Sequence, residues 1–403
     1  MKKAHLNDLV FNSMLFFSIL TVLQGIDALH NINKAWMIAS AGVLIFAIIS
    51  YRVYTAEAII YALTLIVYVA AFVFTPDQLE DLNIIFYFPL WVLFYCFAAH
   101  HKDQILERFR DNKSWYDIVL AAWTVIVGIS LFFSQSHSGG YFVSFAGTSF
   151  RLMPSTLIII ALAMYMYIRT KRFAYNFYLL LPLYATFMGN SRTYFGVAII
   201  LFVAYVYMTM KKKRNFYFIL IPLIILITII AMAGGFGNKV GSTSYTDQSY
   251  FDFWGTVTSG RTVFWEWDLV AFFKLPFWQQ FVGNGFNFVY DVNGAQMARI
   301  WAHNDIINIL MNFGYIGLVV YSWVFVRLVR SFWPRKNKIP ALVKILFILA
   351  VTLNSMFNMS YTYLCAMISY PLFLMVIDAA HQNRAAEKET VNVQAGNWRQ
   401  IEG

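Results

Sequence analysis

Residues 193–234 read TYFGVAIILFVAYVYMTMKKKRNFYFILIPLIILITIIAMAG, which is an apolar run, four cations at 211–214 and a second apolar run. Each apolar run has about the 18 residues that a helix needs to cross a bilayer. The four cations are too costly to bury in hydrocarbon, so they mark a junction on one side of the membrane. This stretch predicts two transmembrane helices joined by a short turn.

The same pattern recurs along the chain, in which 60% of the 403 residues are hydrophobic and 12% are charged. So much apolar sequence excludes a soluble globular domain and indicates an all-α polytopic membrane protein. No signal-peptide cleavage site is evident after Met1, so we expect the first span to act as a signal anchor. The expected spans are the twelve segments 9–27, 34–52, 56–75, 83–100, 116–134, 152–169, 173–189, 193–210, 215–234, 303–326, 339–357 and 361–380.

The distribution of cations predicts the orientation, because positively charged loops remain in the cytoplasm. With the N- and C-termini in the cytoplasm, 23 of the 30 Lys and Arg residues fall in cytoplasmic segments. The same rule accounts for the net charge of +10, so nucleic acid is not an expected partner. The cations expected on the outer face are Lys34, Arg151, Arg192, Lys239, Arg261, Lys274 and Arg299.

The spans divide the chain into four parts: nine transmembrane helices in 1–234, a large outer loop at 235–302, three more helices in 303–380 and a polar cytoplasmic tail at 381–403. A loop of that length in a compact architecture is usually functional, and its aromatic stretches predict helices at the membrane interface. A Ser-Gly-Gly sequence predicts a flexible loop at 135–151, and the tail is expected to be disordered. Cys96 and Cys365 lie in apolar runs and are expected to pack rather than to form a disulfide.

Arg192, Arg261 and His303 all fall on the outer face in this topology, where they suggest a site for a lipid-linked diphosphate. Guanidinium groups form bidentate, permanently charged contacts with phosphate oxygens. A histidine with a pKa near neutrality can accept or relay the proton of an acceptor hydroxyl. These three residues supply the parts for glycosyl transfer without a metal, and the chain lacks the common metal-ligand and nucleotide-binding motifs.

Each of these residues also has an ordinary structural interpretation. Arg192 at the outer end of a span can be a snorkelling arginine, and Arg261 can be a loop charge after a turn at Gly260. His303 at a helix start can be an interfacial residue. Possible accessory residues are Arg151, Asn304 and Asp305, of which Asn304 and Asp305 can instead cap the helix. The carboxylates that could act as bases are Glu266, Asp268 and Asp305, and spacing does not choose among them.

The order of these motifs resembles the bacterial O-antigen ligase and O-antigen polymerase family. The resemblance rests on His303-Asn304 followed after nine residues by Gly314-x-x-Gly317, on Ser259-Gly260-Arg261 with Trp265, on Gly283-Asn284-Gly285, and on Ser191-Arg192-Thr193 at an outer helix end. It covers residues 190–320 in detail and the rest only in architecture.

The resemblance implies a glycosyltransferase with a GT-C-like fold in the bacterial inner membrane, with its active site facing the periplasm. It implies an undecaprenyl-diphosphate-linked glycan as donor, inversion at the anomeric carbon and no cofactor. By this resemblance Arg192 and Arg261 bind the donor diphosphate and His303 acts on the acceptor hydroxyl.

The acceptor is another lipid-linked repeat unit in polymerases and lipid A–core in ligases. Ala302-His303-Asn304-Asp305 after Gly283-Asn284-Gly285 favours a polymerase of O-antigen or capsule repeats. Membrane lipids and a chain-length regulator are the other expected partners. Two further classes stay open, a transporter or flippase for polysaccharide lipids and a non-catalytic scaffold, although the spans hold almost no charged residues near their middle.

Overall fold

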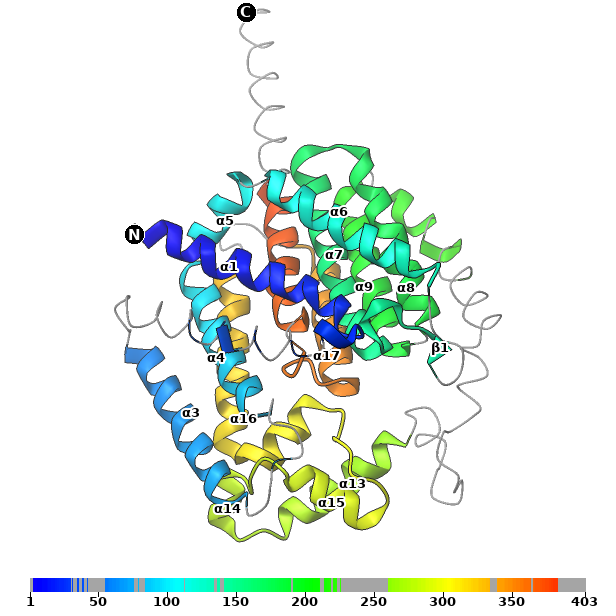
Figure 1. Ribbon diagram of the computed structural model, residues 1–403. Coiled ribbons are helices and arrows are strands. Elements are labelled where there is room, and N and C mark those ends of the chain that lie inside the picture. The colour runs from blue at the N-terminus through cyan, green and yellow to red at the C-terminus, as the bar shows by residue number, and fades with distance from the viewer. Residues whose placement is uncertain are drawn as a thin grey trace, which may run out of the picture.

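The structure is a computed structural model that consists almost entirely of helices (Figure 1). It describes residues 3–29, 55–75, 84–111, 113–133, 136–137, 141–189, 191–210, 260–333, 339–363 and 365–382, with single residues and short stretches in 31–42, at 79 and in 214–225. Most of the spans expected at 34–52 and 215–234, the outer-loop residues 235–259 and the tail after 382 lie outside the described residues.

The first half of the chain contributes α1 (Lys3–Leu20), η1 (Thr21–Leu23), η2 (Asp27–Leu29), α3 (Thr55–Val73), α4 (Ile84–His100), α5 (Lys102–Asp111), α6 (Lys113–Ser130), β1 (Ser136–His137), β2 (Tyr141–Phe142), η3 (Ser144–Ala146), α7 (Ser149–Thr170), η4 (Phe173–Leu179), α8 (Leu180–Met188) and α9 (Arg192–Thr209). The second half contributes α13 (Arg261–Phe273), α14 (Phe277–Val282), α15 (Phe288–Gln296), α16 (Asp305–Phe332) and α17 (Ala341–Phe357), and residues 365–382 are also helical.

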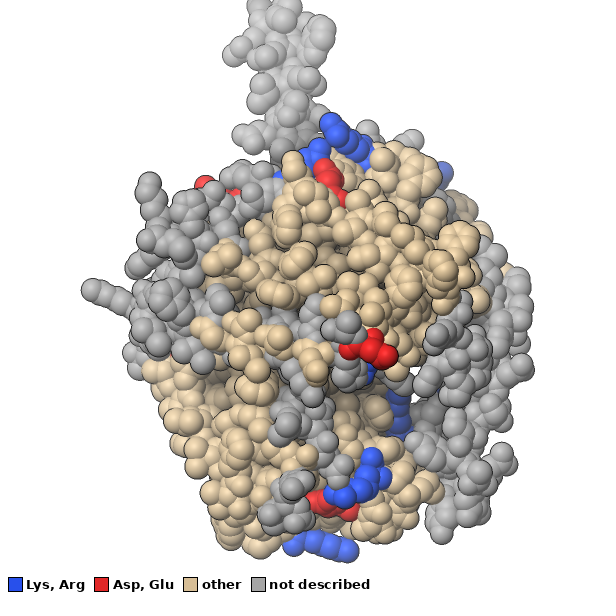
Figure 2. Space-filling model, viewed as in Figure 1, with Lys and Arg blue, Asp and Glu red and all other residues tan. Residues whose placement is uncertain are grey.

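Three described helices are long and apolar enough to cross a membrane, namely Arg151–Thr170, Arg192–Thr209 and Asp305–Phe332. Shorter apolar helices occupy Leu9–Leu23, Glu57–Val73, Ile84–His100, Phe173–Met188 and Ala341–Phe357. Most of the described surface visible in Figure 2 is uncharged. These features are those of a helical membrane protein, and the number of twelve spans stays a prediction.

Helix α7 is enclosed by neighbouring elements along most of its length. Its residues from Leu152 to Met166 are buried, and it packs against η4, α6, α8 and α9. A helix with no polar face gains most from complete enclosure by other helices. The helix ends at Lys171, whose left-handed backbone (φ 57°) closes the last turn before a cation-rich junction.

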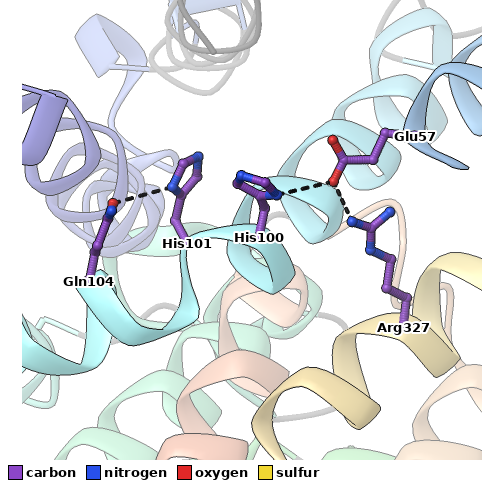
Figure 3. A network of polar contacts seen from close by, with 5 residues as sticks. All are labelled: Glu57, His100, His101, Gln104 and Arg327. Carbon is purple, nitrogen blue, oxygen red and sulfur yellow. Dashed lines mark hydrogen bonds and ion pairs between the residues drawn. The ribbon is translucent and has the colours of Figure 1, made fainter. Parts of the chain in front are cut away.

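Helices α3, α4 and α16 form a second group, with α3 and α16 antiparallel. At one end, Arg327 of α16 donates to the carboxylate of Glu57 in the first turn of α3, and Nδ1 of His100 lies 3.5 Å from the same oxygen (Figure 3). At the opposite end, Thr75 after α3 accepts a 2.9 Å hydrogen bond from the backbone N–H of Phe286. Glu57 and His100 lie in the spans expected at 56–75 and 83–100, Arg327 directly follows the span expected at 303–326, and the three side chains lie together.

Helix α16 breaks at Gly314, where φ is 66° and ψ is −165°. A Cβ at this position would lie 2.4 Å from the backbone of Phe281, so only glycine lets α14 approach so closely. The N–H of Asn284 donates a 3.0 Å hydrogen bond to the carbonyl of Met311 beside the break. The single span expected at 303–326 is therefore bent, and Gly314 serves a break rather than the packing of a straight helix.

Two smaller expectations are also decided by the structure. Of the segment 135–151, expected as a flexible loop, Ser138-Gly139-Gly140 lies outside the described residues, while its flanks form an antiparallel pair of short strands, in which Ser136 pairs with Phe142, followed by η3 and the start of α7. Cys96 and Cys365 are buried and free, which confirms the expectation of packing residues.

Candidate functional site

Arg192 is the first residue of α9, and the packing of this helix places it at one end of the helix bundle. A Cβ at Gly196, one turn into α9, would lie 3.1 Å from Leu353 near the end of α17. Because α9 packs along α17 and its start meets the end of α17, the two helices are antiparallel. Arg192 lies one turn before Gly196, and Phe357 lies one turn after Leu353. Arg192 and Phe357 therefore lie at the same end of the two helices.

Arg261 reaches that end from the outer loop. It is the first residue of α13, directly after Gly260, whose left-handed backbone (φ 80°) turns the chain into the helix. The guanidinium Nη1 donates a 2.5 Å hydrogen bond to the carbonyl of Phe357, the last residue of α17. A carbonyl at a helix C-terminus has no partner within its own helix, so it is a natural acceptor for an arginine.

His303 lies beside Arg261 in the loop between α15 and α16. Trp265, one turn after Arg261 on α13, donates from Nε1 to the carbonyl of Ala302 at 2.6 Å. His303 itself is half-buried, precedes the start of α16 and has a left-handed backbone with φ of 51°. Burial, and after it repulsion by Arg261, lowers the pKa of His303 to about 3. The imidazole is therefore neutral at physiological pH.

Arg151 and Tyr363 adjoin the same place. Arg151 in the first turn of α7 donates from Nη1 to the carbonyl of Gln24 at 3.5 Å. Tyr363 lies in the short turn between α17 and the helix at 365–382. Burial raises the pKa of Tyr363, and the positive charges of Arg261 and Arg151 act against this rise, with a net pKa of about 12.

Tyr363 did not emerge from the sequence as a site residue. It is the third residue of the span expected at 361–380, so the sequence suggested no function for it. The run Ser360-Tyr361-Thr362-Tyr363, four consecutive hydroxyl side chains between two apolar segments, is the signal that marks it.

Asn304 and Asp305 hold α16 in place. The side chain of Asn304 accepts hydrogen bonds from the N–H groups of Ile306 (2.9 Å) and Ile307 (3.2 Å), which is an N-cap. Asp305 accepts from the hydroxyl of Tyr321 at 3.0 Å and from the hydroxyl of Ser360. The capping interpretation of Asn304 is confirmed, and Asp305 ties the start of α16 to the turn that carries Tyr363.

Of the other outer charges, Lys34 and Lys239 lie outside the described residues, and Arg299 and Lys274 are exposed. Arg299 forms a 2.8 Å ion pair with Asp291 on an exposed surface, and Lys274 is exposed at the end of α13, as expected for surface charges. Glu266 is exposed, whereas Asp268 is completely buried. Within the described parts of the chain, no three His, Cys, Asp or Glu side chains are grouped as a metal site would require.

The arrangement places Arg261 at the loop that carries His303, with Arg192 at the same end of the bundle, and the charges of Arg261 and Arg151 both act on Tyr363. Permanent cations beside a neutral imidazole and a phenol can bind a polyanion and accept a proton from a hydroxyl. The sequence matches no protein-family model and no curated protein.

Proposed function

We propose that this chain is a glycosyltransferase of the inner membrane, with twelve spans, that transfers a glycan from undecaprenyl diphosphate to an acceptor hydroxyl at the periplasmic face. The observation that carries the proposal is that α13 holds Arg261 on the carbonyl of Phe357 at the end of α17 and, through Trp265, beside the Ala302 carbonyl that precedes His303. Transfer from a lipid diphosphate develops negative charge on the leaving diphosphate, and preorganised guanidinium groups stabilise such charge.

In the proposed reaction the acceptor oxygen attacks the anomeric carbon, and the bond from that carbon to the diphosphate oxygen breaks. The electron pair of the broken bond leaves with the diphosphate, whose charge Arg192, Arg261 and Arg151 offset. The acceptor hydroxyl gives its proton to the neutral imidazole of His303. A bound diphosphate neutralises Arg261 and removes its repulsion, so substrate binding makes His303 a stronger base.

The choice of acceptor follows the resemblance, which favours a second lipid-linked repeat unit and thus polymerisation. A gel of surface polysaccharide from a deletion strain tests this choice. Loss of the long ladder, with one repeat unit still attached to the core, supports a polymerase. Loss of every attached repeat, with lipid-linked polymer accumulating, supports a ligase and refutes polymerisation.

Arginine substitutions test the diphosphate contact. We expect Arg261→Lys to remain badly impaired, because an ammonium group cannot reproduce the bidentate contact of a guanidinium. His303→Ala should abolish product while the protein inserts normally. Arg299→Lys is the matched control, since Arg299 lies on an exposed surface and pairs with Asp291. If Arg261→Lys makes as much product as the wild type, Arg261 acts by general charge attraction and not by a bidentate contact.

A flippase for polysaccharide lipids is the second candidate, and the break of α16 at Gly314 favours it, because transporters use broken helices near the membrane midplane. The cations of the site lie at helix ends rather than at this break. The test uses a strain that does not export lipid-linked units. If the Arg261→Lys variant restores normal surface polymer in that strain, the result favours the flippase.

A further inference from the structure

Asp305, the first residue of α16, joins the two arms of that helix across its break. Its Oδ2 accepts a 3.0 Å hydrogen bond from the hydroxyl of Tyr321, which lies 16 residues further along the same helix. In a straight α-helix 16 residues span about 24 Å, far beyond the combined reach of the two side chains. The break at Gly314 therefore turns the helix back, so that the arm before it and the arm after it approach each other.

The same carboxylate also reaches the turn after α17. Ser360 donates from its hydroxyl to Oδ2 of Asp305. Ser355, near the end of α17, lies 3.4 Å from the hydroxyl oxygen of Tyr321 and 3.2 Å from that of Ser360. Each hydroxyl has one hydrogen to donate, and those of Tyr321 and Ser360 go to Asp305, so Ser355 donates to one of these two oxygens. One carboxylate thus connects both arms of α16 with α17.

The contact between Asp305 and Ser360 closes a ring around the loop that carries His303. Helix α13 donates hydrogen bonds to the carbonyls of Phe357 and Ala302. Ser360 follows Phe357 by three residues. Asp305 follows Ala302 by the same interval, and its carboxylate accepts from Ser360. His303 lies between two fixed points of this ring, and its φ of 51° is a conformation that persists where the surroundings enforce it.

The carboxylate of Asp305 is closed to an acceptor substrate. The side chain has no exposed surface, and its Oδ1 is buried like its Oδ2. A general base must lie within hydrogen-bond reach of the proton that it takes. A buried carboxylate is costly unless it is hydrogen-bonded, and here the two partners are hydroxyl groups of the protein itself. This carboxylate therefore holds segments of the chain together and does not take a proton from substrate.

We propose that Asp305 is a positioning residue that, through its two hydroxyl partners, holds His303 in a fixed place relative to the end of α17 that Arg261 binds. Hydrogen bonds to an ionised group are about twice as strong as neutral ones, which suits a carboxylate that has to join three segments. The consequence for catalysis rests on the proposed function, whereas the position of His303 does not.

Acylation of His303 by diethyl pyrocarbonate, followed by peptide mass spectrometry, tests this position without any substrate. The reagent attacks neutral imidazole, and its rate rises when the ring becomes more accessible. In Asp305→Leu both hydroxyl groups lose their acceptor, and we expect His303 to react about tenfold faster, the equilibrium equivalent of one lost hydrogen bond or more. Asp305→Asn keeps an oxygen that can accept from both hydroxyl groups and should react like the wild type.

Tyr321→Phe and Ser360→Ala each remove one donor and keep the carboxylate, so they carry the test if the Asp305→Leu protein does not fold. We expect each of them to speed the acylation of His303 by a factor of about two to ten. A wild-type rate of His303 in both of these variants, or equal rates in Asp305→Leu and Asp305→Asn, would overturn the proposal.

Two control variants and two other histidines make the result specific. Tyr315→Phe alters a tyrosine on the same arm of α16 whose ring packs against α13 and α14, and Ser331→Ala removes a hydroxyl that bonds within its own helix. Both should leave the rate of His303 unchanged. His100 and His101, at the opposite end of the bundle, should react as in the wild type in every variant. If they accelerate together with His303, the whole fold has loosened and the positioning role is refuted.

The glycosyl-transfer assay separates this inference from the proposed function. If both hold, Asp305→Leu lowers kcat with KM for the donor little changed, because α13 still holds Arg261, and Asp305→Asn restores kcat. Loss of kcat in Asp305→Asn at a wild-type acylation rate would make Asp305 a base and overturn the positioning role. If the wild type has no transfer activity while the acylation rates shift as expected, the proposed function fails and the positioning role stands.

Discussion

The reactivity of His303 should be nearly independent of pH between 5.0 and 7.5 in the ligand-free protein. An ordinary histidine with a pKa of about 6.5 is about 90% neutral at pH 7.5 and only about 3% neutral at pH 5.0. Its acylation therefore slows about thirtyfold when the pH is lowered from 7.5 to 5.0. The pKa of His303 is lowered to about 3, so its ring is neutral throughout. Its rate, corrected for the intrinsic pH dependence of the reagent, should change by less than about twofold.

The measurement is the rate of modification of the peptide that contains His303, in purified protein, at several pH values. A thirtyfold change would show that the imidazole is solvated and distant from Arg261, and would refute the geometry of the site. Inorganic pyrophosphate supplies a second test: bound at Arg261 it should raise the pKa of His303 and restore a pH dependence. In Arg261→Gln, pyrophosphate should have no such effect.

The same shift predicts the sign of one contribution to stability. The unfolded chain takes up a proton at this residue below about pH 6.5, whereas the folded chain does so only near its lowered pKa of about 3. The unfolded state therefore binds more protons in this interval, and stability rises with pH across it. The contribution of His303 is fully present above about pH 6.5 and is lost as the pH falls, which thermal unfolding of wild type and His303→Gln will show.

Three further variants test the fold. Gly314→Ala should destabilise the protein by about 3 kcal/mol or more in a thermal-shift assay, because the backbone conformation is suited only to glycine and the new Cβ would lie 2.4 Å from Phe281. Gly128→Ala is the control: the nearest atom is 4.0 Å away, so this variant should be neutral or stabilising in the same assay. Glu57→Gln should lower the free energy of unfolding by about 3 kcal/mol because Arg327 loses its counter-charge, and adding Arg327→Met should recover most of the loss. If the effects of the two substitutions simply add in the double variant, the pairing is excluded. Trp265→Phe should lower stability by about 1 kcal/mol and speed acylation of His303, and an unchanged rate would exclude the bond to Ala302 as a restraint.

The sequence predicted the helical class, because hydrophobic length depends on composition alone, and the cation bias gives an expected topology. That rule placed Arg192, Arg261 and His303 on one face, and the structure has them at one end. Residue pairings could not be predicted in this way. The bonds from Arg261 to Phe357 and from Asp305 to Ser360 join segments whose proximity depends on how helices pack.

Backbone conformation was the other limit. Gly314 and Gly317 have the spacing of a close-packed helix surface, and only the approach of α14 shows that Gly314 breaks the helix. Asp268 was one of three carboxylates that spacing could not distinguish. Its burial follows from the packing of α13 on α15, which the order of residues does not specify.

The bond from Arg261 to the carbonyl of Phe357 has a consequence for biogenesis. Arg151 and Arg192 emerge from the ribosome early, whereas the turn that carries Tyr363 is synthesised near the end. The cluster therefore cannot assemble while the first helices insert, and the early cations must be accommodated by water or lipid headgroups until the last helical hairpin docks. If Arg261 belongs to the proposed anion site, a nascent chain arrested before residue 357 should bind no pyrophosphate, and a chain extended past residue 363 should be the first to bind it.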